Sequence, residues 1–200
     1  DHIRGLHSLL DLFPVKHFLT LGESFVGWRL KNLENKARKK GSELIPLIMN
    51  KPITLGEVRL IPLHPGLEPG PPSNSNRRID NDLSLVLRLE YKNFSMLFTG
   101  DIGEKTEEKL TATSQQLKAD VLKGPHHGSR FSNSSDFIKA VRPSTVIFSS
   151  GYLNRMHHPH PETLERYQEA GVDIRRTDEH GAVQIITDGN GYEIRTHESL

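Results

Sequence analysis

Histidine clustering is the feature that most constrains this chain. Five of its eleven histidines fall within 35 residues, at His126, His127, His157, His158 and His160. Each lies in a loop just after a predicted strand, and such loops commonly carry binding and catalytic side chains. Asp101 also sits at the edge of a predicted strand. We therefore expect a site built from imidazole and carboxylate groups that are held on loops.

The absence of cysteine narrows the chemistry of such a site. With no Cys in 200 residues, disulfide frameworks, thiolate zinc sites and cysteine nucleophiles are excluded. Imidazole and carboxylate ligands suit Zn²⁺, Mn²⁺ or Fe at a hydrolytic centre, because they leave the metal acidic enough to ionise bound water. One carboxylate can also bridge two ions about 3.5–4 Å apart, and the hydroxide between them can attack phosphoryl centres.

Each motif taken alone also has a purely structural interpretation. His-His-Gly-Ser at 126–129 fits a polar turn, and Thr-Gly-Asp at 99–101 fits a strand end with Asp101 as a helix N-cap. The segment 157–160 fits the turn chemistry of a Pro-rich loop. The order and spacing of the motifs, and not any single one, favour a shared site.

Hydrophobic periodicity predicts a mixture of helices and strands. Helical spacing predicts helices over 5–13, 27–40, 104–117, 135–141 and 161–170. Apolar runs predict strands over 57–63, 83–90, 94–99, 120–123, 144–149, 182–187 and 191–196, with 83–90 and 94–99 as an antiparallel hairpin and 65–76 as a surface loop. Hairpins in the middle and alternating elements later predict an α+β sandwich of sheets with helices outside, not an all-parallel sheet.

Length and charge limit the organisation and the partners. Two hundred residues are the size of one domain, so we expect a single domain over 1–200. A formal net charge of +1 gives no long-range attraction to a polyanion, so a nucleic-acid site must be local. The basic segment 29–40 and the cations Lys123, Arg130 and Arg155 would serve such a site if they share its face. Segment 29–40 also fits an ordinary solvated helix face.

The chain shows no targeting signal and reads as a fragment of a longer protein. No run approaches the roughly 18 apolar residues that a transmembrane helix requires, and no charged-then-apolar segment opens the chain. The sequence begins with Asp1, in what reads as the middle of a motif. We therefore expect further sequence upstream.

Several short motifs follow one another in a specific order. They are Asp-His-Ile-Arg-Gly-Leu at 1–6, Asn-Asp-Leu-Ser-Leu-Val-Leu at 81–87, Leu-Phe-Thr-Gly-Asp-Ile at 97–102, Ala-Asp-Val-Leu-Lys-Gly-Pro-His-His-Gly-Ser at 119–129, Val-Arg-Pro at 141–143, Ser-Gly, Asn-Arg and His-Pro-His-Pro-Glu between 150 and 162, and Arg-Thr-Asp and Gly-Ala-Val between 176 and 183. In this order they closely resemble the metallo-β-lactamase-fold domain of the bacterial competence channel proteins ComEC/Rec2. The resemblance covers nearly the whole chain.

The resemblance implies a four-layer α/β/β/α sandwich, with the metal site at one edge where its two sheets meet. In the family, the Asp-His pair ends a longer His-x-Asp-x-Asp-His stretch, so the upstream ligands and the N-terminal strands are missing from this sequence. Arg4 replaces a glycine of the usual motif. Asn81 stands where many members of the superfamily have histidine, so one metal position is expected to be weak or differently filled.

The resemblance also implies individual roles. It implies two divalent ions, Mn²⁺ or Zn²⁺, depleted in this fragment and bound by Asp1, His2, Asp101, His126 and His158, with Asp101 as the bridging carboxylate. The implied catalytic residues are Asp101, His126, His127 and His158. Substrate phosphate is expected at Ser129, Ser150, Asn154 and Arg155, because hydroxyl, amide and guanidinium donors suit an anionic ligand.

The implied function is a metal-dependent phosphodiesterase that degrades the DNA strand that is not imported. It would act at the extracytoplasmic face of the bacterial inner membrane. Its partners would be single- or double-stranded DNA, the membrane channel domain of the same polypeptide and other competence proteins, with no small organic cofactor. Two alternatives stay open: another hydrolase on this fold, acting on a lactone or a small phosphodiester, and a non-catalytic DNA-binding or gating module.

Overall fold

A computed structural model of the chain describes all residues except 1–3, 22–27, 66–80, 114–116 and 198–200. It divides into two compact units, residues 1–51 with 67–79 and residues 52–66 with 80–200. We describe each unit by itself. Among the helices described, none is long and apolar enough to cross a membrane.

The smaller unit combines two helices with two short parallel strands. Its helices are α1 (Arg4–Leu12) and α2 (Trp28–Lys39), and its paired strands are β1 (His17–Thr20) and β2 (Glu43–Pro46). Leu10, Leu33 and Ala37 form its buried core. Both helices were predicted from the spacing of apolar residues, whereas the two four-residue strands were not.

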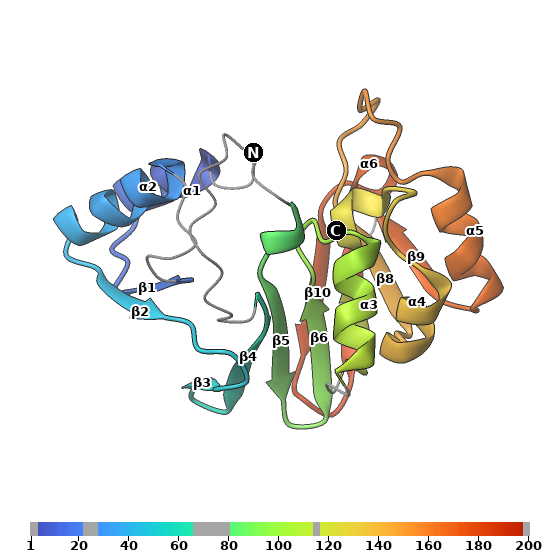
Figure 1. Cartoon of the computed structure of the whole chain (residues 1–200), viewed down its shortest axis with the longest axis horizontal. Coiled ribbons are helices and arrows are strands. Elements are labelled where there is room, and N and C mark those ends of the chain that lie inside the picture. The colour runs from blue at the N-terminus through green and yellow to red at the C-terminus, as the bar shows by residue number, and fades with distance from the viewer. Residues whose placement is uncertain (1–3, 22–27, 66–80, 114–116, 198–200) are drawn as a thin grey trace. The chain divides into compact units, whose positions relative to one another are not determined.

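The larger unit is built on a seven-stranded mixed sheet, labelled in Figure 1. Its strands lie in the order β3 (Ile53–Leu55), β4 (Val58–His64), β5 (Val86–Tyr91), β6 (Phe94–Phe98), β7 (Val121–Lys123), β8 (Thr145–Phe148) and β9 (Asp173–Arg176). Neighbours from β3 to β6 pair antiparallel, and neighbours from β6 to β9 pair parallel. The carboxyl ends of four strands therefore lie along one edge of the sheet.

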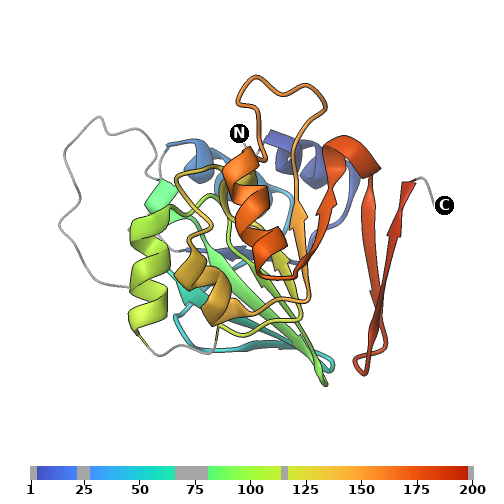
Figure 2. The same ribbon diagram turned by 90° about the vertical axis from the view of Figure 1, so that its right-hand side faces the viewer.

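Helices cover one face of this sheet and a β-hairpin covers the other, as the two views in Figures 1 and 2 show. The helices that connect the parallel strands are α3 (Glu104–Ala112), α4 (Ser135–Val141) and α5 (Pro161–Glu169), and the one-turn α6 (Thr177–His180) follows β9. The hairpin consists of β10 (Val183–Thr187) and β11 (Tyr192–Thr196). The unit is thus a mixed α/β structure with a central mixed sheet.

The alternation of side chains along the strands explains why both faces are covered. On β6, Leu97 belongs to the core beneath the helices, whereas Phe94 and Met96 belong to the core beneath the hairpin. Tyr192 of β11 packs on Phe94, with ring centroids 5.5 Å apart. A strand that is apolar on both faces must be covered on both sides, and the hairpin covers the second one.

Most predicted elements are confirmed. β5 and β6 form the predicted antiparallel hairpin. The predicted sandwich is confirmed in part: the described residues form a central mixed sheet with helices on one face and a two-stranded hairpin on the other. β3, β9 and α6 were not predicted. The predicted helix over 104–117 ends at Ala112, and near this end the hydroxyls of Thr111 and Thr113 donate to carbonyls of the preceding turn. Apart from Pro65, the predicted loop 65–76 lies outside the described residues.

A buried carboxylate joins several elements of the helical face. Glu107 of α3 is fully buried and accepts hydrogen bonds from Asn133 N at 2.5 Å and Ser134 N at 2.9 Å. The Asn133 side chain accepts from Tyr167 Oη of α5 at 2.9 Å and donates to Pro125 O at 3.0 Å. Burial raises the pKa of Glu107. This network connects α3 and α5 to the loop that follows β7.

Replacing Glu107 should therefore destabilise the larger unit. Glu107→Ala leaves two buried backbone N–H groups without an acceptor, and we expect a loss of about 3 kcal/mol in the free energy of unfolding. Urea denaturation followed by circular dichroism measures it. The adjacent Glu108 is exposed, so Glu108→Ala should change stability by less than about 0.5 kcal/mol. Equal effects of the two variants would contradict a structural role for this carboxylate.

Candidate functional site

The four predicted catalytic residues meet at the carboxyl edge of the parallel strands. Asp101 follows β6, His126 and His127 follow β7, and His158 lies in the loop between β8 and α5. The backbone N–H of His126 donates to Gly100 O at 3.0 Å, which joins the first two loops. Ligands of open α/β sheets bind at this kind of edge. Strand order thus brings together groups that are far apart in sequence.

The turn that carries His126 and His127 has an unusual backbone. Both residues have left-handed φ values, +46° and +57°, which cost a non-glycine residue about 1 kcal/mol or more. Glycines let the surroundings close around this turn. A Cβ on Gly124 would lie 2.3 Å from the Phe148 ring, and a Cβ on Gly128 would lie 2.5 Å from Pro159. Tertiary packing therefore sets the directions of the two imidazoles.

Asp101 and His127 form an ion pair in this site. Asp101 Oδ1 lies 3.4 Å from His127 Nε2, and the opposite ring nitrogen, Nδ1, lies 2.6 Å from Ser149 O. Hydrogen bonding to Asp101 raises the pKa of His127, against the opposing effect of burial. Both ring nitrogens of His127 thus have an oxygen acceptor beside them, which favours the protonated form of the ring. The pair is a carboxylate beside an oriented imidazole.

His126 and His158 form the other half of the cluster. Their ring centroids lie 5.8 Å apart in an edge-to-face arrangement, and the ring of His126 is 6.2 Å from that of His127. His126 Nε2 lies 3.4 Å from Asn81 Nδ2. Burial lowers the pKa of His158, and the neighbouring imidazoles lower it further. The cluster thus holds two imidazoles whose pKa values are shifted in opposite directions, that of His127 upwards and that of His158 downwards.

Lys123, at the end of β7, adds a half-buried amine to the site. Its ammonium donates to Gly124 O at 2.8 Å. Burial lowers the pKa of Lys123, and the nearby Asp101 carboxylate opposes that shift. The signal that identifies Lys123 is its place at the end of an apolar strand, immediately before Gly-Pro-His-His. The basic groups around Asp101 thus include an amine as well as an imidazole.

The donor types suit a divalent cation, but the described donors do not form a metal site. In the part of the chain that the structure describes, no group of three or more His, Asp or Glu side chains is arranged to hold an ion. His127 engages Asp101 and Ser149, and His126 faces Asn81. The remaining predicted ligands, Asp1 and His2, lie outside the described residues. The described side chains therefore do not fit a metal ion by themselves.

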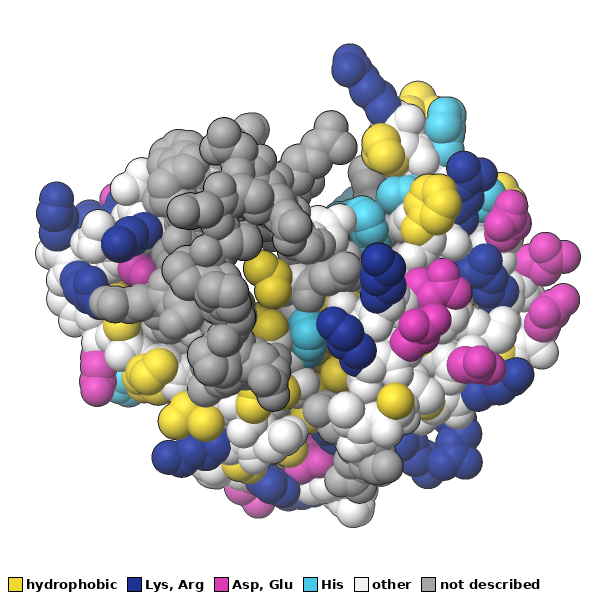
Figure 3. Space-filling view, in the orientation of Figure 1, with side chains coloured by type: hydrophobic (Ala, Val, Ile, Leu, Met, Phe, Trp, Pro, Cys, Tyr) yellow, Lys and Arg dark blue, Asp and Glu magenta, His cyan; other side chains and the backbone are white. Residues whose placement is uncertain are grey.

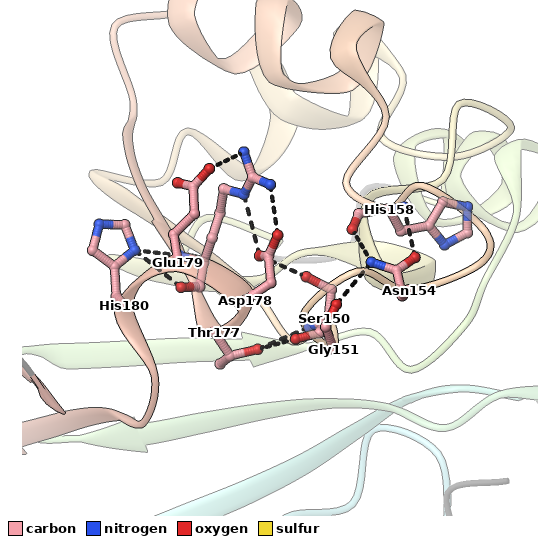
Figure 4. A network of polar contacts seen from close by, with 9 residues as sticks. Ser150, Gly151, Asn154, His158, Thr177, Asp178, Glu179 and His180 are labelled. Atoms are coloured by element: carbon pink, nitrogen blue, oxygen red, sulfur yellow. Dashed lines mark hydrogen bonds and ion pairs between the residues drawn. The ribbon is translucent and has the colours of Figure 1, made fainter.

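The four predicted phosphate contacts differ in their surroundings. Ser129 is buried, with 3% of its surface exposed, and its hydroxyl accepts from Phe131 N. The hydroxyl of Ser150 donates to Asp178 at 2.9 Å, and the Asn154 amide bonds to the backbone around it, as Figure 4 shows. Arg155 is exposed on the loop between β8 and α5. Sequence reasoning did not single out Asp178 as a support of this loop.

Comparison with known proteins gives relatives of one kind. No family model matches the chain. The chain is 32% identical over 185 residues to ComE operon protein 3 of Bacillus subtilis, a stretch that covers 92% of this chain and 23% of that protein. It is 39% identical over 115 residues to competence protein ComA of Neisseria gonorrhoeae, and 35% identical over 114 residues to recombination protein 2 of Haemophilus influenzae.

These curated relatives are much longer than this chain. The matches to ComA and recombination protein 2 each cover 57% of this chain, and 17% and 14% of those proteins. The chain thus spans less than a quarter of each relative. Among solved structures, it is similar to the metallo-β-lactamase fold protein YhfI of Bacillus subtilis, with a TM-score of 0.49 and 12% identity over 88% of this chain and 70% of that one.

Gly128 should be required for the two histidine loops to meet. Gly128→Ala places a methyl group against Pro159 at a φ of +86°, and we expect a loss of about 2–4 kcal/mol in stability together with shifted imidazole NMR signals of His126 and His158. Gly151→Ala is the matched control, because its added Cβ meets nothing within 4 Å. Unchanged imidazole signals in a folded Gly128→Ala protein would show that this contact does not position the rings.

Proposed function

We propose that this chain, which is homologous to the ComEC/Rec2 competence proteins over most of its length, is a domain that hydrolyses phosphodiester bonds in DNA. The observation that carries the proposal is the gathering of Asp101 with three imidazoles at the carboxyl edge of a mixed sheet. The contact between the loops after β6 and β7 supports a single site.

The described residues suggest a division of roles. Asp101 would orient the ring of His127, which in its protonated form would attract a phosphate oxygen. His126 and His158, with ring centroids 5.8 Å apart, are placed to serve one phosphodiester together. One imidazole would accept the proton of the attacking water, and the other would protonate the oxygen that leaves when the P–O bond breaks.

Two divalent ions, Mn²⁺ or Zn²⁺, belong to the proposal through the resemblance to metallo-β-lactamase-fold domains. The described donors do not hold an ion by themselves, so further ligands are needed. Asp1 and His2 are the proposed additions from this chain. Bound ions would neutralise charge on the phosphoryl oxygens. The two proton transfers are proposed for protein side chains and not for the ions.

The fold and setting are proposed on the same basis. The helical face, the seven-stranded sheet and the hairpin on its second face support three of the layers of an α/β/β/α sandwich. The length of the relatives supports a place within a longer polypeptide that carries the membrane channel. We propose that the domain faces the extracytoplasmic side of the bacterial inner membrane, works with other competence proteins and degrades the strand that is not imported.

Asp101→Ala should abolish DNA cleavage. The assay uses labelled single- and double-stranded DNA with Mn²⁺ or Zn²⁺, and the loss follows because this carboxylate orients His127 and is the proposed bridging ligand. Asp136→Ala on α4 removes an exposed carboxylate and should leave cleavage unchanged. If the wild type hydrolyses lactones or small phosphodiesters but leaves both DNA forms intact with either metal, the nuclease proposal is wrong. Binding of DNA without any hydrolysis would instead favour the non-catalytic module.

Arg155→Ala should weaken DNA binding more than it slows cleavage at saturating DNA. Removing one phosphate contact reduces the slope of log affinity against log salt by about one at most. Titrations of labelled DNA at several salt concentrations, without divalent metal, measure the slope. Lys105→Ala on α3 removes an exposed cation from a helix and should leave the slope unchanged. An equal change in both variants would argue against a specific contact at Arg155.

A further inference from the structure

The loop between β8 and α5 is fixed at its base. The backbone N–H of Ser150 donates to Thr177 Oγ1 at 2.9 Å, and the Thr177 hydroxyl donates back to Ser150 O at 2.7 Å. The Ser150 hydroxyl donates to Asp178, whose carboxylate also binds the guanidinium of Arg176 at 2.6 Å. Figure 4 shows these contacts together. The start of the loop is therefore clamped to the end of β9.

A second clamp holds the other end of the loop beside the histidine cluster. Asn154 Nδ2 donates to Gly151 O at 3.0 Å and to His158 O at 2.6 Å, while Asn154 Oδ1 accepts from His158 N at 2.9 Å. Both amide hydrogens of Asn154 are thereby used within the loop. Asn154 thus links the two ends of the loop tip, and the neighbouring residues Tyr152, Leu153 and Met156 are exposed.

The projecting part of the loop carries large apolar side chains in water. Tyr152, Leu153 and Met156 are 80%, 83% and 70% exposed, and Arg155 lies among them. Figure 3 shows hydrophobic, basic and histidine side chains gathered on this projection, which stands beyond the helices in Figure 1. Exposed apolar groups that a fold holds on a braced loop mark an interaction surface. The side-chain types at residues 152–156, aromatic, aliphatic and basic, indicate which kind of ligand binds there.

Single-stranded nucleic acid has the features that this surface matches. An exposed aromatic ring offers a face for base stacking, and an arginine beside it offers a charge for the phosphate backbone. Among the described residues no ion pair engages Arg155, whereas the guanidinium of Arg130 lies over the ring of Phe131, 4.8 Å from its centroid. In a duplex the faces of the bases are covered by their neighbours, so a stacking side chain gains nothing there.

We infer that the loop tip, Tyr152 to Met156, is a stacking platform that holds an unpaired base next to the histidine cluster. The inference rests on the proposed function, because it assigns the strand that this same site receives. His158 belongs both to the braced loop and to the cluster, where its ring lies 5.8 Å from that of His126. The same braced loop therefore carries both the exposed ring of Tyr152 and one of the candidate catalytic imidazoles.

Binding without cleavage tests the platform. The full chain, kept in EDTA, is titrated with a fluorescein-labelled oligothymidylate and with a blunt duplex of equal length at several salt concentrations. Tyr152→Leu should weaken single-strand binding about fivefold or more, leave the salt slope unchanged and leave duplex binding unchanged. Tyr152→Phe should bind as the wild type does, because it keeps the ring. Leu55→Ala, an exposed apolar side chain on β3, is the control and should have no effect.

Several results would overturn the platform. Equal single-strand affinity for the wild type and Tyr152→Leu would show that no base stacks there. Binding to phosphatidylglycerol vesicles that depends on Tyr152 and Leu153, with unchanged oligonucleotide affinity, would identify a membrane contact instead. Cleavage assays on the same variants separate the two proposals. If the protein cleaves DNA but its single-strand binding does not depend on Tyr152, only the platform is refuted. If single-strand binding depends on Tyr152 but no DNA is hydrolysed with Mn²⁺ or Zn²⁺, only the nuclease proposal is refuted.

Discussion

Parallel pairing of β6, β7, β8 and β9 is the constraint on which the candidate site depends. The pairing register sets Phe98 beside Lys123, and Lys123 beside Ile147, so these strands end at the same edge of the sheet. Each following loop therefore starts from a fixed point. Asp101, the His126 turn and the loop that carries His158 come together because their strands do, and any of them would be misplaced by a shift in register.

Buried polar contacts compensate for the strained backbone at this edge. The turn after β7 places two histidines at positive φ, which local preference opposes. Asn133 ties that turn down through Pro125 O, and Glu107 holds Asn133 from α3. The same network reaches α5 through the Tyr167 hydroxyl. The helical face thus stabilises the strained turn as well as covering the sheet, and the stability of the unit and the geometry of the site are coupled.

Much of the secondary structure could be predicted from sequence, and the errors have physical causes. The β5–β6 hairpin follows from two apolar runs, and the short helices α4 and α5 follow from helical spacing of their few apolar residues between clear boundary residues. β9, Asp-Ile-Arg-Arg, was not predicted because three of its four side chains are charged, a composition that does not favour a strand. It forms a strand through its parallel pairing with β8. α3 ends before the predicted boundary, at a Thr-rich segment of low helix propensity, which hydrophobic periodicity does not register.

The sequence by itself determined which residues could form the site and which homologous proteins it resembles, because the ordered Asp and His motifs are readable without coordinates. Only the tertiary structure decided which partner each of those side chains contacts. It paired Asp101 with His127, set His126 against His158 and turned Ser150 and Asn154 towards Asp178 and the loop backbone. Most of these partners lie tens of residues apart in the sequence, and each contact also depends on the direction of a side chain. Strand register and packing set the distance and the direction, whereas a local sequence pattern sets neither of the two.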